Sequence, residues 1–290
     1  MDSAYLLNLA FNGAVIGLIT ALAALSITLV FGIARFPNAA TGDVATAGAF
    51  AGLLGPVLGS GALPIILVGM ATSAAVSLLF YVVLFRALAK RSPVASLIAS
   101  IGMAFFLRAV LTYFIGHDQR VYPLPLVRAV PFGPLRVQAA DIQVIVWAGA
   151  ALAVTFALIH LTPIGKRMRA VADNPDLARS SGINANKVMV VMWVVAGLLA
   201  GLAGTLLGVK TVVSPEMGWD LLMPAFAATI LGTIGNPLGA VLGGLLIGLA
   251  QELSTPLVGF TYKIGVGFLV LLLTLLIRPQ GLFAKNSLVR

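Results

Sequence analysis

The sequence predicts an all-α fold, a polytopic bundle of transmembrane helices with about eight or nine membrane segments, including broken or re-entrant helices. Of the 290 residues, 60% are hydrophobic and only 9% are charged, and the mean hydropathy is +1.07. A soluble domain has about a quarter of its residues charged. This chain therefore cannot cover a water-facing surface, and we expect one transmembrane domain over residues 1–290.

Eight apolar stretches approach the length of about 20 residues that a helix needs to cross a bilayer. They cover residues 6–31, 44–59, 63–85, 94–115, 141–161, 188–209, 221–250 and 258–277. Each should be helical, because backbone groups in lipid must be paired within the chain. As one helix, 221–250 would be about 45 Å long, more than the bilayer core of about 30 Å. Gly235-Asn236-Pro237 interrupts it, which predicts two shorter helices.

Lysine and arginine residues are concentrated in alternate loops, which predicts the orientation by the positive-inside rule. Twelve lie in one set of loops and five in the other. The twelve are Arg35, Arg86, Lys90, Arg91, Lys166, Arg167, Arg169, Arg179, Lys187, Arg278, Lys285 and Arg290, and the five are Arg120, Arg128, Arg136, Lys210 and Lys263. The richer set should be cytoplasmic, with the N-terminus periplasmic and the C-terminus cytoplasmic. Residues 1–3 lack the basic region of a cleavable signal peptide, so we expect the first span to be retained.

Several classes of function are disfavoured by what the sequence lacks. The chain has no cysteine and only two distant histidines, so we expect no metal site and no catalytic residue. It has no phosphate-binding G-x-x-x-x-G-K-[ST] motif. The net charge is +9, but the basic residues lie between apolar spans, so we expect no nucleic-acid partner. Only Arg108 and Glu252 approach the buried ionisable groups that an ion-coupled carrier needs, which argues against that class.

Glycines on the stretch 188–209 indicate close helix packing. Gly197, Gly201, Gly204 and Gly208 are spaced by four, three and four residues and therefore share one helix face. Since lipid provides no hydrophobic drive between helices, such a face should lie against another helix. We expect that helix to belong to the same chain, with a subunit interface as the alternative.

The segment 162–187 predicts two short amphipathic helices at the membrane surface. Thr162 can cap the first helix, with Pro163 at its first position. Asn174 followed by Pro175 should end that helix and begin the second, and Gly182 suits the left-handed position that closes the second. The residues alone favour a charged interfacial loop, with a coupling element that docks on a soluble motor as the alternative.

Polar residues inside apolar spans are candidates for a substrate path, because they are costly in lipid. The candidates are Asn12, Thr28, Thr46, Ser96, Ser100, Arg108 and Asn236. Arg108 could contact a substrate carboxylate, although snorkelling or pairing with an internal carboxylate is the commoner use of such an arginine. Asp43 is interpreted as an acidic residue at a helix start, where the dipole favours it.

Four stretches, in order along the chain, resemble the branched-chain amino acid ABC permeases of LivH type. They are 26–33 with Asn38 and Gly42, 173–179 with 182–184, 232–244, and 278–283. Residues 38–43 depart from the family, because they lack the histidine and phenylalanine that usually follow the asparagine. Gly235-Asn236-Pro237 also places a bulky residue where the family usually has a glycine-rich pair. These departures leave the substrate open.

The resemblance implies a membrane-spanning permease subunit of an ABC importer for branched-chain or related amino acids in the bacterial inner membrane. ATP and Mg²⁺ would be bound by separate cytoplasmic ATPase subunits. A periplasmic solute-binding protein and a second permease subunit, a LivM-type paralogue or a second copy, would be further partners. The segment 162–187 would then be the coupling element, with contacts at Arg169, Ala172, Asp173, Asn174, Ala178, Arg179 and Gly182. A permease for urea, short amides or simple sugars is the alternative, and an ion-coupled secondary transporter is the second alternative.

Overall fold

The computed structural model describes residues 3–283 except 90, 126–129, 134, 261 and 279, and this part of the chain is dominated by helices. The long ones are α1 (Ser3–Ala34), α4 (Ala62–Phe80) with its continuation η1 (Tyr81–Phe85) and α5 (Arg86–Leu88), α6 (Pro93–Ile115), α7 (Ala139–Leu161), α10 (Ala185–Lys210) and α12 (Pro237–Val258). All six are long and apolar enough to cross a membrane. The predicted all-α transmembrane bundle is confirmed.

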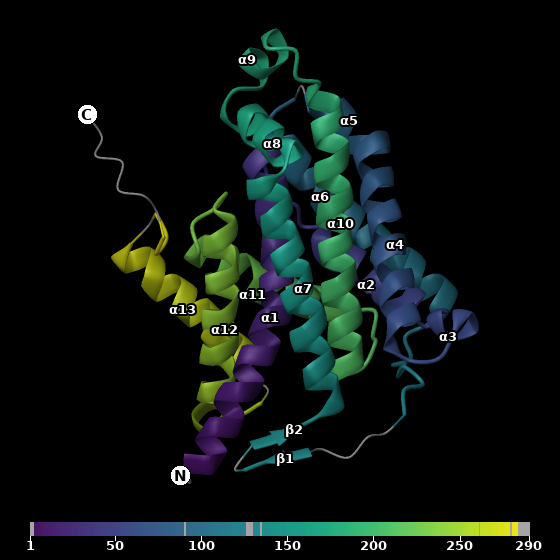
Figure 1. Ribbon diagram of the computed structural model, residues 1–290, viewed down its shortest axis with the longest axis vertical. Helices are drawn as coiled ribbons and strands as arrows, with labels where there is room; N and C mark the ends of the chain where they lie inside the picture. The colour runs from purple at the N-terminus through teal and green to yellow at the C-terminus, as the bar shows by residue number, and fades with distance from the viewer. Residues whose placement is uncertain are drawn as a thin grey trace.

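The shorter elements complete the bundle. They are α2 (Thr41–Gly52), α3 (Gly55–Leu58), α8 (Pro163–Asp173), α9 (Pro175–Ser180), α11 (Met217–Leu231) and α13 (Lys263–Ile277). The proline-rich linker also holds a small antiparallel hairpin of β1 (Val130–Phe132) and β2 (Leu135–Val137), with Pro131 opposite Arg136. We call the end of the bundle with α8 and α9 the α8–α9 end, and the other the hairpin end (Figure 1).

The chain passes back and forth between these two ends (Figure 1). Successive passes are α1, residues 35–52 with α2, α4 to α5, α6, α7, α10, α11, α12 and α13. The described residues make nine passes, an odd number, so α1 starts at the hairpin end and α13 ends toward the α8–α9 end. Residues 280–283 lie by the last turn of α11, where the Leu282 N–H donates to the Leu231 carbonyl at 2.8 Å. The start of α1 and residues 280–283 therefore lie at opposite ends of the bundle, which agrees with the charge pattern.

The predicted crossing helix at 44–59 is wrong in its form. α2 has 12 residues, about 18 Å, and is too short to cross alone. Irregular backbone at 35–40 makes up the difference, and two of its N–H groups are satisfied by side chains inside the protein. Asn38 Oδ1 accepts from the Ala40 N–H and Ser100 Oγ from the Ala39 N–H, both at 3.1 Å.

The predicted break in 221–250 is confirmed. α11 ends at Leu231, and left-handed backbone follows at Thr233 (φ 75°) and Gly235 (φ 85°). α12 then begins at Pro237, with the Asn236 side chain accepting from the Gly239 N–H at 3.2 Å. The second helix thus begins where Asn236 as a cap and Pro237 as the first helical residue predict it.

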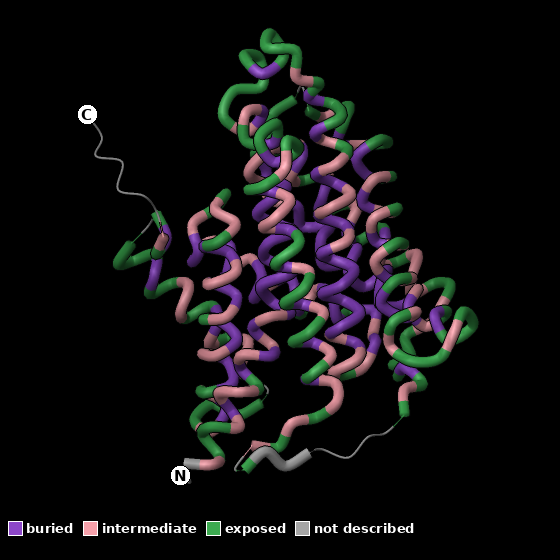
Figure 2. Tube along the Cα trace, viewed as in Figure 1, coloured by how far each residue is buried: buried purple, intermediate pink, exposed green. Residues whose placement is uncertain are grey.

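Buried residues run through the middle of the bundle (Figure 2). Of the six long helices, α1 and α10 are the most buried, whereas α6 and α7 are the least buried. In their most apolar windows, 78% and 67% of the residues of α1 and α10 are buried, against 17% and 28% for α6 and α7. Gly201 faces Gly69 and Ser73 of α4, and Gly204 lies against the Ala45 carbonyl of α2. The predicted glycine face therefore packs on helices of the same chain.

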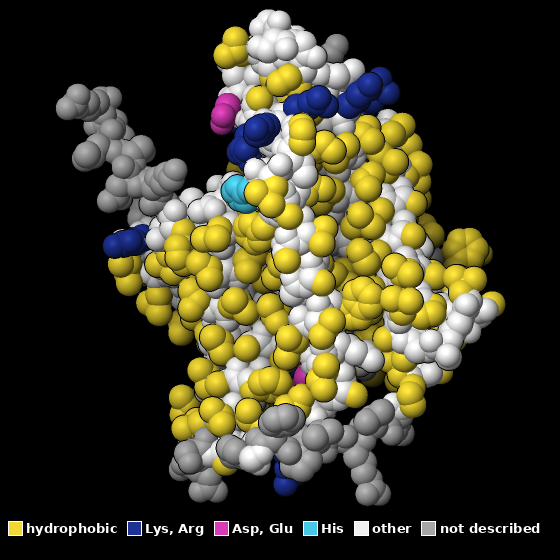
Figure 3. Space-filling view, in the orientation of Figure 1, with side chains coloured by type: hydrophobic (Ala, Val, Ile, Leu, Met, Phe, Trp, Pro, Cys, Tyr) yellow, Lys and Arg dark blue, Asp and Glu magenta, His cyan; other side chains and the backbone are white. Residues whose placement is uncertain are grey.

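Apolar side chains cover the middle of the bundle, and basic side chains gather toward its ends (Figure 3). The basic residues described at the hairpin end are Arg120, Arg136, Lys210 and Lys263, whereas the nine others predicted for the cytoplasm lie toward the α8–α9 end. Lys90, Arg128, Lys285 and Arg290 lie outside the described residues. At the hairpin end, buried carboxylates hold two of the cations, in the pairs Lys210–Asp141 and Lys263–Glu252.

Candidate functional site

The α8–α9 segment is held in shape by its capping residues. Thr162 Oγ1 accepts from the Gly165 N–H at 3.3 Å, and Asn174 Oδ1 accepts from two N–H groups of α9 at 3.0 Å each. Gly182 has a φ of 79°. Its N–H donates to the Arg179 carbonyl, and the next N–H donates to Ala178, both at 3.0 Å. This Schellman closure and the two caps form the predicted helix pair.

α8 is fixed to the bundle on its inner side. Met168 and Val171 are buried, and the Arg169 guanidinium donates to the Ile159 carbonyl at the end of α7. Arg35, just after α1, donates to the Ala172 carbonyl at 2.6 Å. These contacts tie α8 to α1 and α7, so a displacement of α8 would be transmitted to both helices.

α9 projects beyond α8 and forms the tip of the molecule (Figure 1). Its Leu177 is 65% exposed. Among the seven predicted coupling residues, Arg169, Asp173, Asn174, Arg179 and Gly182 are exposed, Ala172 is half-buried and Ala178 is buried. Arg169 nevertheless bonds inward, and Ala178 is covered by the rest of the chain. The remaining exposed residues are free to meet a partner.

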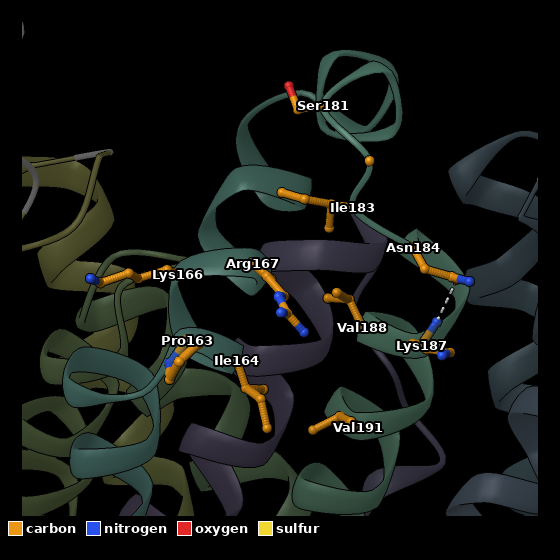
Figure 4. Close-up of a pocket in the computed structure, with 11 residues that line it drawn as sticks. Pro163, Ile164, Lys166, Arg167, Ser181, Ile183, Asn184, Lys187, Val188 and Val191 are labelled. Carbon is orange, nitrogen blue, oxygen red and sulfur yellow. Dashed lines mark hydrogen bonds between the residues drawn. The ribbon is translucent and has the colours of Figure 1, made fainter.

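A groove of about 610 Å³ lies between α8 and the start of α10 (Figure 4). Ile164, Val188 and Val191 provide apolar lining. Lys166, Arg167 and Lys187 also line the groove and make it basic. The groove is therefore lined by both apolar and basic side chains.

A second candidate site lies inside the bundle, where α2, α6 and α11 meet. Arg108 binds Asp43 through two hydrogen bonds, from Nε to Oδ1 at 2.9 Å and from Nη2 to Oδ2 at 3.1 Å. Asp43 is fully buried, and the Arg108 side chain is 19% exposed. The guanidinium carbon lies 5.2 Å from the Trp219 ring centre and 5.6 Å from that of Phe105. We call these four residues the Arg108 layer.

The candidate path residues do not all gather there. Thr46 lies by Gly218, close to the Arg108 layer, because Gly42 of α2 packs directly on Gly218 of α11. Ser100 holds the 35–40 backbone. The remaining four lie apart: Asn12 accepts from Lys210 Nζ at the hairpin end, Asn236 caps α12, Ser96 is buried near the start of α6, and Thr28 is buried in α1. Thr28 Oγ1 has no hydrogen-bond partner among the described residues.

Sequence reasoning missed the part that Asp43 and Trp219 play. Asp43 was interpreted as a helix-start residue, and it does lie in the first turn of α2, but its carboxylate binds Arg108. A signal was available. An arginine within an apolar span calls for a carboxylate, and Asp43 borders another apolar stretch. Nothing in the sequence alone indicates that Trp219 lies beside Arg108.

The bundle, its internal charged layer and its projecting helix pair define a polytopic membrane transport component. Residues 9–277 match the family described as "Branched-chain amino acid transport system / permease component". The chain belongs to this family, and the LivH-type resemblance is confirmed.

Two relatives are similar over almost their whole length. The high-affinity branched-chain amino acid transport system permease protein LivH of Escherichia coli K12 is 30% identical, covering 97% of this chain and 96% of its own. BraD of Pseudomonas aeruginosa, with the same description, is 31% identical and covers 94% of each. The ribose import permease protein RbsC of Bacillus subtilis is 36% identical over 83 residues, 28% of this chain.

A solved structure shares the fold. PsaBC from Streptococcus pneumoniae in complex with Fab has a TM-score of 0.51 and covers 95% of this chain and 92% of its own, at 13% identity. The likeness in fold extends over nearly the whole bundle, and the chain is a multi-pass protein of the inner membrane.

Proposed function

We propose that this chain is the membrane-spanning permease subunit of an ABC importer that moves branched-chain or related amino acids across the inner membrane. The observation that carries this proposal is the full-length similarity to LivH and BraD, which are described as branched-chain amino acid permeases. The match to a ribose permease covers 28% of this chain, so it gives the sugar alternative much weaker support. Urea and short amides remain alternatives of the same class.

ATP hydrolysis would take place on separate ATPase subunits, since the sequence has no phosphate-binding loop motif. These subunits would bind the α8–α9 end, whose excess of basic residues favours the cytoplasm. A periplasmic solute-binding protein would deliver substrate at the hairpin end. A second permease subunit, a LivM-type paralogue or a second copy, would complete the pore.

The α8–α9 segment would couple the ATPases to the bundle. Asp173, Leu177 and Arg179 are exposed, so a partner can reach them. On the inner side, Arg35 and Arg169 bind α8 to the ends of α1 and α7. Closure of the ATPases would push the segment as a rigid body and shift those helices between two discrete arrangements.

The Arg108 layer would line the path of the amino acid. Asp43 uses Nε and Nη2 of Arg108, so Nη1 is available for a substrate carboxylate. Asp220 follows Trp219 on α11, is exposed, and lies within electrostatic range of Arg108. The substrate's carboxylate would thus contact Arg108, its ammonium group would contact Asp220, and its apolar side chain would contact Trp219. Because Asp43 is paired with Arg108, it is poorly suited to the proton cycle of a secondary carrier.

The coupling proposal is tested by two variants with matched controls. Gly182→Arg places a bulky cation at the tip, and Gly116→Arg is its control at the hairpin end, because both glycines have left-handed backbone and open space around them. Asp173→Arg has Asp118→Arg as its exposed control. We expect the tip variants to stop co-purifying with the ATPase. Their transport rate in proteoliposomes should fall about tenfold or more, which corresponds to about 1.4 kcal/mol.

Both control variants should keep ATPase binding and transport. If the tip variants bind the ATPase and transport normally, the coupling assignment is wrong. Transport by the purified permease with only an ion gradient and no ATPase present would instead refute the importer as a class.

A further inference from the structure

A second hollow at the α8–α9 end, separate from the groove of Figure 4, is ringed with arginines. Its volume is about 300 Å³, and it is walled by the end of α1, η1 and α5, the start of α6, and the start of α10. Val171 of α8 and Pro175 of α9 border it on the outside. The lining includes four cations: Arg35, Arg86, Arg91 and Arg179. We call this hollow the arginine pocket.

The inner wall of the arginine pocket is aromatic. Phe85 stacks on Trp193 with ring centres 4.8 Å apart, and Tyr81 stacks on the same indole at 5.9 Å. Both lie in the π-helical turn η1, and such turns occur frequently at functional sites. Trp193 is 1% exposed, and its indole Nε1 has no hydrogen-bond partner among the described residues. A buried donor is thus left unsatisfied in the wall of a basic hollow.

The positive charge of the pocket is not balanced within the described part of the chain. Arg35, Arg86 and Arg91 have no carboxylate within salt-bridge distance there, and Arg179 pairs only with the exposed Asp176, at 3.3 Å. The start of α6 also borders the pocket and has no acidic residue in its first turn. The positive end of that helix dipole therefore adds to the arginines. The ligand that fits this field is an anion.

The surface next to the pocket is apolar and open. Leu79, Val82 and Val83 precede Arg86 along α4 and η1, and Val94 and Ile98 follow Arg91 on α6; all five are exposed. A free phosphate or an acidic peptide would use the arginines and leave this apolar face unused. A phospholipid uses both, because its acyl chains are attached to its anionic headgroup.

We infer that the arginine pocket binds the phosphodiester headgroup of an anionic phospholipid, with the acyl chains along the exposed faces of α4 and α6. Basic pockets between transmembrane helices commonly bind such headgroups. Arg35 follows α1 and Arg179 lies on α9, whereas Arg86 lies in α5 and Arg91 in the turn before α6. The bound lipid links the coupling segment to the edge of the bundle.

Native mass spectrometry of the purified chain in a neutral detergent, titrated with phosphatidylglycerol, tests the inference. The variant is Arg86→Gln/Arg91→Gln, and its matched control is Arg120→Gln/Arg136→Gln, which removes two exposed cations at the hairpin end. We expect one saturable lipid to bind the wild type and the control equally. In the Arg86/Arg91 variant its Kd should rise roughly 30-fold, about five-fold for each arginine.

Three results would overturn the inference. In the first, both double variants bind the lipid as the wild type does. In the second, phosphatidylcholine binds the site as tightly as phosphatidylglycerol, which would mean that the pocket does not select an anionic headgroup. In the third, glycerol phosphate alone binds as tightly as the lipid and needs the same arginines, which would assign the pocket to a soluble phosphate. Unfolding temperatures of the variants, measured in parallel, verify that the exposed substitutions leave the fold intact.

Discussion

At the scale of single residues, the ion pair of Asp43 and Arg108 places two charged side chains inside the bundle. A fully buried carboxylate is stable in such surroundings only when it is paired, and two parallel hydrogen bonds to a guanidinium are the strongest pairing available. The pair joins the half-length helix α2 to the edge helix α6. It also holds the guanidinium beside Trp219.

Breaking the Asp43–Arg108 pair from one side should be costly. Asp43→Asn leaves a largely buried cation without a counter-charge, and we expect the free energy of unfolding to fall by about 3 kcal/mol or more. Arg108→Gln should cost a similar amount. The double variant Asp43→Asn/Arg108→Gln should cost clearly less than the sum, as measured by thermal unfolding in detergent. Additive losses would mean that the two side chains do not interact.

Transport separates the structural role of Arg108 from its proposed contact with substrate. If the guanidinium only holds α2 in place, the stable double variant should transport with a normal KM. A raised KM in that variant is expected if Arg108 binds the carboxylate of the amino acid.

At the scale of elements, glycine faces determine how closely the helices approach. Gly204 of α10 lies against the Ala45 carbonyl of α2, and Gly17 of α1 lies against the backbone of α12 at Gly248. These are backbone-to-backbone contacts, so a side chain has no flexible neighbour to displace. Van der Waals contact at such short range replaces the hydrophobic drive that lipid does not provide.

A methyl group added at Gly204 should therefore separate α10 from α2. Gly204→Ala is expected to destabilise the bundle by about 1–3 kcal/mol, the usual cost of overpacking. Gly149→Ala is the matched control, since Gly149 lies inside the helix α7 with nothing near the added methyl group. The control should unfold at the wild-type temperature or above it, because alanine favours the helix. Equal behaviour of the two variants would contradict the packing argument.

At the scale of the whole molecule, the described residues make an odd number of passes, so the start of α1 and residues 280–283 lie at opposite ends of the bundle. α2, α11 and α13 are shorter than a full span, and irregular backbone lies next to α2 and α11. Basic residues are concentrated at the α8–α9 end, so the helix pair that would couple to the ATPases and the positive-inside charge fall on one face.

Cysteine labelling tests this topology cleanly, because the natural sequence has no cysteine. Tyr5→Cys near the start of α1 should react with a membrane-impermeant maleimide in intact cells. Leu282→Cys, beside the end of α11, should react only after the membrane is permeabilised. Thr211→Cys and Ser181→Cys, on either end of α10, give the outer and inner references. Labelling of positions 5 and 282 from one side would refute the odd number of passes.

Much of the local structure was predictable because it depends on short-range physics. Thr162, Asn174, Gly182 and Asn236 sit at the caps where the sequence places them, because a cap is made by a side chain and its next few backbone groups. Residues 44–59 misled the prediction for the same reason. Their hydropathy suits a span, but α2 ends at Gly52, and the irregular backbone before it is held by Ser100, 61 residues away from its partner Ala39.

The sequence by itself determined that the chain is a helical membrane bundle, which end is basic, where the helices break, and which family it resembles. These follow from composition, periodicity and local capping. Only the tertiary structure decided that Asp43 meets Arg108 and Trp219, that glycines of α10 contact α2 and α4, and that four arginines from separate segments surround one hollow. Each of these is a contact between residues far apart in the chain, and which of them meet is fixed only when all the helices pack together.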